Sequence, residues 1–280
     1  MKRRKMNTEC LEEFKAYLEN EERSAATVEK YIRDVKRFVD YISAKKLCKQ
    51  SVLEYKSMLG NAYAVASANS MIAATNCFLR FCGWHELCVK QFKMQRKVYC
   101  SEEKELTRAE YLRLLDAANK KRNERLNLII QTICSTGIRV SELEYITVEA
   151  VERGEAVVNC KGKNRRIFIV PELRKKLIRY TKEQRIKGGR VFVTRNGKPI
   201  SRNNVWREMK SLCKEANVSP SKVFPHNLRH LFARTFYGIE KDIAKLADIL
   251  GHASINTTRI YIVTTGAEHK RKMEHMRLII

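Results

Sequence analysis

The sequence predicts a mainly α-helical protein of two domains, with a small β-sheet confined to a second domain of the α+β class. At 280 residues the chain is too long for one ordinary core and suits two domains of roughly 100–200 residues. Residues 7–95 show helical periodicity with neither proline nor a β-rich run, and strand patterns appear only beyond residue 150. Hydrophobic residues form 44% of the chain, enough apolar surface to exclude a disordered protein.

The N-terminal region, residues 1–95, is predicted to be a small helical bundle. Residues 24–45 carry apolar side chains at helical spacing, and Ser24 or Thr27 is placed to cap the start of that helix. A second apolar set predicts a helix that ends near Gly83. Residues 96–105 belong to a mostly polar stretch without this periodicity and predict a linker. The two apolar sets are Val28, Tyr31, Ile32, Val35, Phe38, Val39 and Ile42, then Met71, Ile72, Thr75, Phe78, Leu79 and Cys82.

The C-terminal region, residues 106–280, mixes helices and strands. Thr107 and Glu110 form a capping box for a helix that ends near Asn119, and a second helix is predicted over residues 123–135. Two predicted strands, Ala156–Cys160 and Arg165–Val170, flank a four-residue hairpin turn at residues 161–164. Further predicted elements are a short strand at residues 191–194 closed by Asn196-Gly197, a helix from Ser201 with Val205, Met209, Leu212 and Ala216 on one face, and four short helices between Pro225 and the end.

Positive charge dominates the composition. The chain has 56 Lys and Arg against 31 Asp and Glu, a formal net charge of +25 that must lie on the surface and attract polyanions. Residues 1–100 hold 19 basic and 11 acidic residues, and residues 101–280 hold 37 and 20, so both regions are basic. Nucleic acid is therefore the predicted partner, ahead of an acidic membrane surface, and a neutral metabolic enzyme is disfavoured. Charge alone does not separate a ribosomal protein, a transcription factor and a DNA-processing enzyme.

The cysteines and the N-terminus bear on location and metal binding. Nine cysteines, an odd number without a C-x-x-C pair, predict a reducing cytoplasm and no disulfide framework. No apolar segment follows the basic start, and no apolar run reaches about 18 residues, so neither a secretory signal nor a membrane-spanning helix is expected. Three cysteines and one histidine form a cluster that lacks the paired spacing typical of zinc sites. We interpret its members as small apolar residues on a helix, with metal binding as the less favoured alternative. They are Cys77, Cys82, His85 and Cys88.

Five segments carry residues that point to a common chemistry. His226 and Arg229 are three residues apart and share a helix face, and Pro225 would place both near the positive end of that helix. The segments offer guanidinium, imidazole, ammonium and phenol groups but no cluster of carboxylates that would hold Mg²⁺. Such a set suits metal-free chemistry on a phosphodiester, because the cations neutralise the developing charge and the protein itself supplies the nucleophile and the acid. Each residue taken singly has an ordinary structural explanation. The five segments are residues 136–143 (TGIRVSEL), the Lys161 hairpin, residues 225–230 (PHNLRH), residues 250–252 (LGH) and Tyr261.

Taken together and in this order, the segments resemble those of the tyrosine recombinase (phage integrase) family. TGIRVSEL resembles the first arginine box of the family, HNLRHLFART resembles its HxLRH box, and ILGHASINTTRIYI resembles its LGH-to-Tyr segment, with nine residues from His252 to Tyr261. The resemblance covers nearly the whole chain, weakly in the N-terminal helices and strongly from about Leu106. It implies a helical SAM-like core-binding domain at 1–95, a linker at 96–105 and a catalytic domain at 106–280, which would form a C-shaped clamp on DNA.

The resemblance also implies a role for each matched residue. Tyr261 would be the nucleophile that attacks a DNA phosphodiester, giving a 3′-phosphotyrosyl link and a free 5′-hydroxyl, with acid–base help from His226. Arg139 and Arg229 would clamp the non-bridging oxygens, because two guanidinium forks match a phosphate better than ammonium groups do. His252 would hydrogen-bond the same phosphate.

The remaining positions of the implied site lie beside these residues. Lys161 would protonate the leaving 5′-oxygen from the hairpin, with Lys163 in the same turn as the alternative. Glu142 resembles the acidic residue that orients the site. His230 is expected to pack structurally, and Arg234, at a position where many members carry Thr, is given no catalytic role.

The implied function is site-specific DNA recombination without metal, ATP or another cofactor, because the phosphotyrosyl link conserves the energy of the broken bond. The implied partners are double-stranded DNA and further copies of the chain, a tetramer on synapsed DNA, with a tail helix at about residues 266–280 docked in trans, or packed in cis as the alternative. Two alternative functions are compatible with the same motifs: a type IB topoisomerase-like enzyme that relaxes supercoils as a monomer, and a non-catalytic DNA-binding relative. An RNA-binding protein is disfavoured because the sequence lacks an aromatic RNP-type motif.

Overall fold

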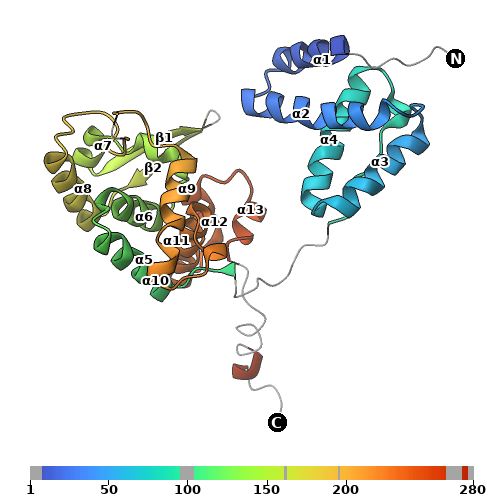
Figure 1. The fold of residues 1–280 in the computed structure, drawn as a ribbon. Helices are drawn as coiled ribbons and strands as arrows, with labels where there is room; N and C mark the ends of the chain where they lie inside the picture. Colours follow the sequence, from blue (N-terminus) through green and yellow to red (C-terminus); the bar gives the residue numbers. More distant parts are fainter. Residues whose placement is uncertain (1–7, 95–103, 161–162, 195, 263–272, 277–280) are drawn as a thin grey trace. The chain divides into compact units, whose positions relative to one another are not determined.

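The computed structural model describes residues 8–94, 104–160, 163–194, 196–262 and 273–276 (Figure 1). The chain divides into two compact units, Met1–Arg96 and Lys97–Ile280. Helices dominate both units, and the sheet among the described residues has two strands and lies in the second unit, which confirms the predicted class. In the described part of the chain, no helix is long and apolar enough to cross a membrane.

The N-terminal unit is the predicted helical bundle. The helix predicted from residue 24 is α2, and the second predicted helix is α4, which ends where Gly83 adopts a φ of +73°. Ser24 precedes α2, but its hydroxyl bonds the Thr27 hydroxyl at 2.8 Å and caps no backbone N–H. The elements are α1 (Thr8–Asn20), α2 (Ala25–Ile42), α3 (Lys49–Ala62), α4 (Val65–Phe81) and the short 3₁₀ helix η1 (His85–Leu87).

Aromatic side chains fill the core of this unit. Phe14 meets Phe78 edge-on with ring centroids 5.2 Å apart, and Phe38 meets Tyr55 at 5.1 Å. All four rings are buried, so α1, α2, α3 and α4 share one core. The cysteines of the cluster noted in the sequence pack against this core as small apolar side chains: Cys77, Cys82 and Cys88.

The C-terminal unit is built around α6 (Glu124–Thr136), which packs against helices on several sides. Leu126, Ile129, Ile130 and Ile133 of α6 are fully buried. The predicted capping box at Thr107 is confirmed by reciprocal hydrogen bonds with Glu110 of 2.8 and 3.2 Å. The other helices are α5 (Arg108–Lys120), η3 (Val140–Tyr145), α7 (Val148–Arg153), α8 (Pro171–Glu183), α9 (Arg202–Lys210), α10 (Cys213–Ala216), η4 (Pro220–Lys222), α11 (Pro225–Glu240), α12 (Ile243–Leu250) and α13 (Ile255–Arg259).

The predicted hairpin forms, but its turn is shorter than expected. Strands β1 (Glu155–Cys160) and β2 (Lys163–Phe168) are antiparallel, with Glu155 opposite Phe168 and Cys160 opposite Lys163. The four-residue turn is therefore wrong, because Lys163 and Asn164 belong to the ladder and only residues 161–162 connect the strands. The buried face of the ladder, with Ala156, Val158 and Ile167, fixes this register.

Three other predicted elements differ from the structure. Residues 191–194 make only an isolated bridge, Val193 with Pro199, because the chain turns back at Gly197 before a ladder can extend. The helix that Ser201 caps stops at Lys210, and α10 is a separate short helix. The segment after Pro225 begins with a 16-residue helix, α11, and not with a short one.

Two helices end on glycines beside the motif residues. α6 ends at Gly137, with φ +66°, and α12 ends at Gly251, with φ +64°. A Cβ atom at Gly137 would lie 2.4 Å from Cδ1 of Phe232. The chain can therefore turn from α6 into the TGIRVSEL motif against α11 only with glycine at this position.

Gly137→Ala should destabilise the C-terminal unit more than Gly154→Ala does. Both glycines have positive φ, but a Cβ at Gly154 would meet nothing closer than Arg174 at 3.9 Å, so Gly154→Ala controls for backbone strain alone. The steric overlap with Phe232 should lower the free energy of unfolding by roughly 1–3 kcal/mol beyond that control. Urea unfolding followed by Trp206 fluorescence in a Trp84→Phe background measures this, since the chain has 2 tryptophans. Equal losses in the two variants would contradict the overlap.

Candidate active site

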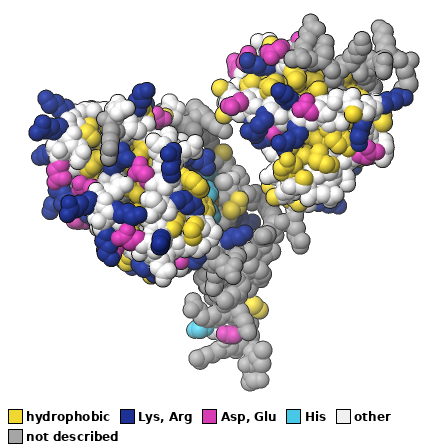
Figure 2. Space-filling model, viewed as in Figure 1, with side chains coloured by type: hydrophobic (Ala, Val, Ile, Leu, Met, Phe, Trp, Pro, Cys, Tyr) yellow, Lys and Arg dark blue, Asp and Glu magenta, His cyan; other side chains and the backbone are white. Residues whose placement is uncertain are grey.

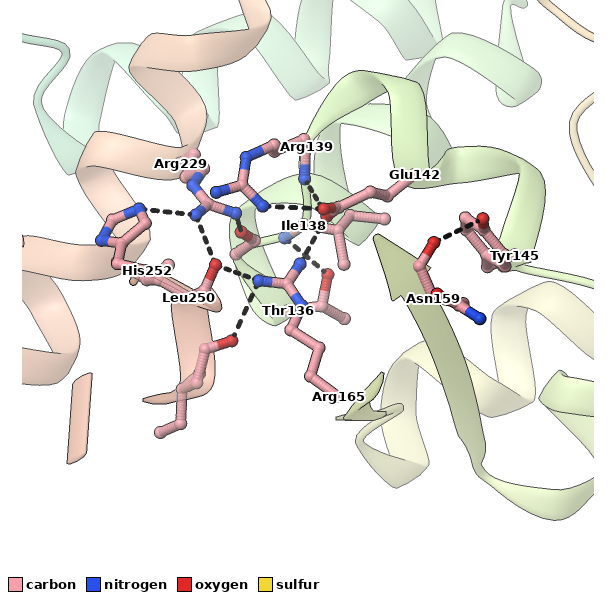
Figure 3. Close-up of polar contacts among 12 residues, drawn as sticks. Thr136, Ile138, Arg139, Glu142, Tyr145, Asn159, Arg165, Arg229, Leu250 and His252 are labelled. Carbon is pink, nitrogen blue, oxygen red and sulfur yellow. Dashed lines mark hydrogen bonds and ion pairs between the residues drawn. The ribbon is translucent and has the colours of Figure 1, made fainter. Parts of the chain in front are cut away.

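The motifs that lie far apart in the sequence meet in the C-terminal unit. Arg139 stands at the start of η3, Arg229 in the second turn of α11, His252 just after α12, and Tyr261 just after α13. Figure 3 shows Arg139, Arg229 and His252 converging around the ends of α6 and α12. Lys161 lies outside the described residues, and Lys163 is the first residue of β2.

Arg229 is the buried centre of the site, with 1% of its surface exposed. Its Nη1 donates to the Gly137 carbonyl at 2.5 Å, and its Nη2 donates to the Leu250 carbonyl at 2.7 Å. These carbonyls stand at the C-terminal ends of α6 and α12, where helix dipoles place partial negative charge and favour a cation. Burial and then the Arg139 charge lower the pKa of Arg229 to about 10, so the group stays protonated at neutral pH.

Arg139 is held by a buried carboxylate. Its backbone N–H donates to Glu142 Oε2 at 2.8 Å and its Nη1 donates to Oε1 at 2.8 Å, so Glu142 both caps η3 and orients the guanidinium. The Glu142 side chain is 4% exposed and that of Arg139 is 38% exposed. Arg139 therefore keeps part of its side chain in solvent while its Nη1 is fixed on Glu142.

A second arginine, Arg165 of β2, completes the contacts of Glu142. Arg165 Nη2 pairs with Glu142 Oε2, and Arg165 Nη1 donates to the Leu250 carbonyl (Figure 3). Arg165 lies outside the motifs that single out the other site residues in the sequence. Its position could have indicated it, because Arg165 alternates with the apolar Ile167 and Ile169, which places it on the buried face of its strand.

His252 is neutral and its tautomer is fixed by its two partners. Its Nε2 lies 2.9 Å from Arg229 Nη2, and since a guanidinium only donates, Nε2 accepts. The proton is therefore on Nδ1, which donates to Thr258 Oγ1 at 2.8 Å. Burial, followed by the charges of Arg229 and Arg139, lowers the pKa of His252 to about 4.

Tyr261 lies among three histidine rings. It is 5% exposed and stacks on His230 with centroids 4.3 Å apart, while the rings of His226 and His252 lie at 5.4 and 5.2 Å. Arg229 Cζ is 5.9 Å from the centroid of the phenol ring. The phenol is thus surrounded by imidazoles and faces the buried guanidinium.

His226 and His230 share one face of α11 but differ in environment. His226 is exposed, and its pKa is lowered by desolvation and by the positive charges of Arg229, Arg139 and Arg202. His230 is more enclosed, and burial lowers its pKa to about 4. Both rings are therefore neutral near pH 7, and a neutral imidazole can accept a proton.

The arrangement suits an anionic substrate. The site holds three arginines and one buried carboxylate, Glu142, which pairs with Arg139 and Arg165 but not with Arg229, so an excess of positive charge remains. A phenol and neutral imidazoles adjoin this charge and provide a nucleophile with proton acceptors. Preorganised guanidinium groups in a partly buried site stabilise negative charge that develops on a substrate. Within the described ranges, no group of three or more His, Cys, Asp or Glu side chains is arranged to hold a metal ion.

The low pKa values of His230 and His252 predict that acid destabilises the C-terminal unit. Unfolded histidine titrates near ~6.5, and both groups titrate at about 4 in the folded unit. The unfolded chain binds the protons first, so the stability contribution is present above the unfolded pKa and is lost as pH falls toward about 4. His230→Phe keeps the stack on Tyr261 but cannot be protonated, so it should lose less stability than the wild type between neutral and acidic pH. Urea unfolding of both proteins at neutral and at acidic pH tests this, and an identical loss of unfolding free energy in wild type and variant would refute it.

Comparisons with known proteins identify the family of the chain. Residues 104–267 match the phage integrase family, and residues 11–86 match the phage integrase N-terminal SAM-like domain. The tyrosine recombinase XerA of Thermococcus kodakarensis is 32% identical over 280 residues, covering 97% of this chain and 96% of that protein. The XerA protein of Pyrococcus furiosus is 28% identical over 286 residues, covering 100% of this chain and 98% of that protein.

Solved structures show the same fold. A lambda integrase dimer bound to a core site superposes with a TM-score of 0.75 at 17% identity, covering 93% of this chain and 96% of that one. A lambda integrase tetramer bound to a Holliday junction superposes with a TM-score of 0.72 at 18% identity, covering 90% of this chain and 76% of that one. The fold therefore agrees with the sequence matches across both units. The match to the family covers more than half of the chain, and the chain belongs to the phage integrase family.

Proposed function

We propose that this protein is a site-specific DNA recombinase that cuts and rejoins DNA strands through a covalent link to Tyr261. The observation that carries the proposal is the packing of the Tyr261 phenol against Arg229 and the rings of His226 and His252, inside the region that matches the phage integrase family. The full-length relatives named tyrosine recombinases support the same activity.

The proposed reaction begins when a DNA phosphate enters between Arg139 and Arg229. The Arg139 side chain is partly exposed, so it can contact the phosphate without rearranging the core. Arg229 already donates to two carbonyls and lies next to His252, so a phosphate there would compete for its Nη2. The negative charge of the phosphate would raise the pKa of His252 and favour donation from its Nε2.

The chemical step exchanges one phosphoester bond for another. The phenolic oxygen of Tyr261 forms a bond to phosphorus, and the bond from phosphorus to the 5′-oxygen breaks. The phenol proton passes to neutral His226, and the leaving 5′-oxygen takes a proton from Lys161, or from Lys163 as the alternative. The 5′-hydroxyl of another strand reverses the step, so joining needs no nucleotide cofactor.

Double-stranded DNA and further copies of the chain are the proposed partners. Lysine and arginine side chains are spread over the visible face of both units (Figure 2), and both regions of the sequence carry a positive surplus. DNA-bound dimers and tetramers of lambda integrase support assembly on DNA. We further propose that the two units grip the duplex together, that residues 266–280 dock on a neighbouring subunit, and that the protein acts in the cytoplasm. Most of that tail lies outside the described residues.

Tyr261→Phe should bind the target DNA but form no covalent adduct, because only the phenolic oxygen can attack phosphorus. The target duplex is first identified by sequencing DNA that stays attached to the wild-type protein in cells. A nicked version of that duplex then traps the adduct, which denaturing electrophoresis resolves with EDTA present. Adduct formation by the variant would overturn Tyr261 as nucleophile. Relaxation of a plasmid without the site would favour the topoisomerase-like alternative.

Arg139→Ala should slow cleavage far more than it weakens binding. The variant removes one preorganised donor to the developing charge, a change that lowers rates by roughly 10²–10³-fold in other enzymes. Because Arg139 is 38% exposed, its loss should leave the fold intact. Single-turnover adduct formation at saturating DNA gives the rate, and a gel-shift titration gives the affinity. Parallel losses in rate and affinity would assign Arg139 to DNA holding alone.

A further inference from the structure

Arg165 joins three segments of the catalytic unit through a single guanidinium. It projects from β2, pairs with the Glu142 carboxylate on η3 and donates to the Leu250 carbonyl at the end of α12. A further bond of 3.3 Å reaches the Ile249 carbonyl. The side chain is 12% exposed, so these contacts lie inside the unit and are shielded from solvent.

The end of α12 is shaped to receive this arginine. A Cβ atom at Gly251 would lie 2.8 Å from Arg165 Cδ and 2.9 Å from its Nη1. Glycine at this position therefore serves both the left-handed turn at the end of α12 and the close passage of Arg165. The next residue along the chain is His252, so the same turn sets the position of the backbone from which that imidazole extends.

The Leu250 carbonyl is shared by two arginines. Arg229 Nη2 donates to it at 2.7 Å from α11, and Arg165 Nη1 donates to it from β2. The Glu142 carboxylate is shared in the same way between Arg139 and Arg165. Arg165 thus contacts the acceptor that orients Arg139 and also the acceptor that holds Arg229 beside His252, and Figure 3 shows it between these two groups.

We infer that Arg165 is a positioning residue for strand cleavage, which keeps Glu142 and the end of α12 where Arg139 and His252 need them. This inference rests on the proposed function. Arg165 does not reach the reacting atoms itself, because its guanidinium is occupied by protein acceptors on the buried face of β2. Its contacts anchor β2, the strand that begins two residues after Lys161 in the sequence.

The neighbouring Arg166 provides a matched control. It lies on the opposite face of the same strand, is 70% exposed, and its nearest carboxylate is Glu155 at 4.0 Å. Arg166→Gln removes the same charge from the same hairpin without touching the contacts of Glu142 or Leu250. A difference between the two Gln variants therefore reports on position and not on net charge.

The test compares Arg165→Gln, Arg165→Lys and Arg166→Gln in single-turnover adduct formation at saturating DNA. Arg165→Gln should slow cleavage by roughly 10–100-fold, as loss of a supporting partner commonly does, with DNA affinity within about twofold of wild type. The cleavage rate of Arg165→Lys should lie between those of the wild type and Arg165→Gln, since an ammonium keeps the charge but cannot bridge both acceptors. If Arg165 acts through Glu142, adding Arg165→Gln to Glu142→Gln should cost less than the sum of the two single losses.

The inference would be overturned if Arg165→Gln cleaved at the wild-type rate, or if Arg166→Gln lost as much cleavage rate as Arg165→Gln. A loss of DNA affinity as large as the loss of rate would also overturn it. Thermal unfolding checks that each variant is folded, and if Arg165→Gln is not, the Arg165→Lys rate decides the question.

A second readout does not depend on activity. The Arg165 charge helps to depress the pKa of His252, after burial, Arg229 and Arg139. In Arg165→Gln the histidine should titrate above its wild-type value of about 4, measured by NMR of the imidazole signals with His252→Gln as assignment control. Arg166→Gln should leave the value unchanged. If the wild-type protein forms no adduct, the proposed function fails, and an unshifted His252 resonance in Arg165→Gln would then overturn the positioning contact.

Discussion

The burial of the Arg229 guanidinium is the constraint on which the rest of the catalytic unit depends. A cation with 1% exposure is tolerated only where acceptors surround it, and the ends of α6 and α12 supply them. Gly137 must stop α6, and Leu250 must end α12, at positions that aim these carbonyls at one group. The packing of α11 against α6 is therefore tied to the geometry of the site.

Burial, followed by repulsion from nearby positive charges, lowers the pKa of the histidines around Arg229. His252 is neutral, because its Nε2 must accept the hydrogen bond that the neighbouring Arg229 guanidinium donates. His226 and His230 lie in the same positive, partly desolvated surroundings, which also lower the pKa of each. The site thus keeps its cations on arginine, which cannot easily lose a proton, and its proton acceptors on histidine. This division of labour suits a nucleophile that must lose its proton beside an anionic substrate.

Several local features could be predicted from sequence because they depend on near neighbours. The capping box at Thr107, the end of α4 near Gly83 and the start of α11 at Pro225 follow from side chains and backbone preferences within a few residues. The four-residue hairpin turn was wrong because the register is fixed by burial of alternate strand residues against the core, which local turn preferences do not contain. The strand expected at residues 191–194 formed only an isolated bridge, because the chain turns back at Gly197 before a ladder can extend.

The sequence by itself determined which chemical groups are available and in what order: two arginines, a hairpin lysine, two histidines and a tyrosine in motifs that resemble one family, within a strongly basic chain. Only the tertiary structure decided how they act on one another. The contacts of Arg165 with Glu142 and Leu250, and of Thr258 with His252, join residues on different elements. Such contacts arise because buried polar groups must find partners wherever packing brings them, and sequence spacing does not record that encounter.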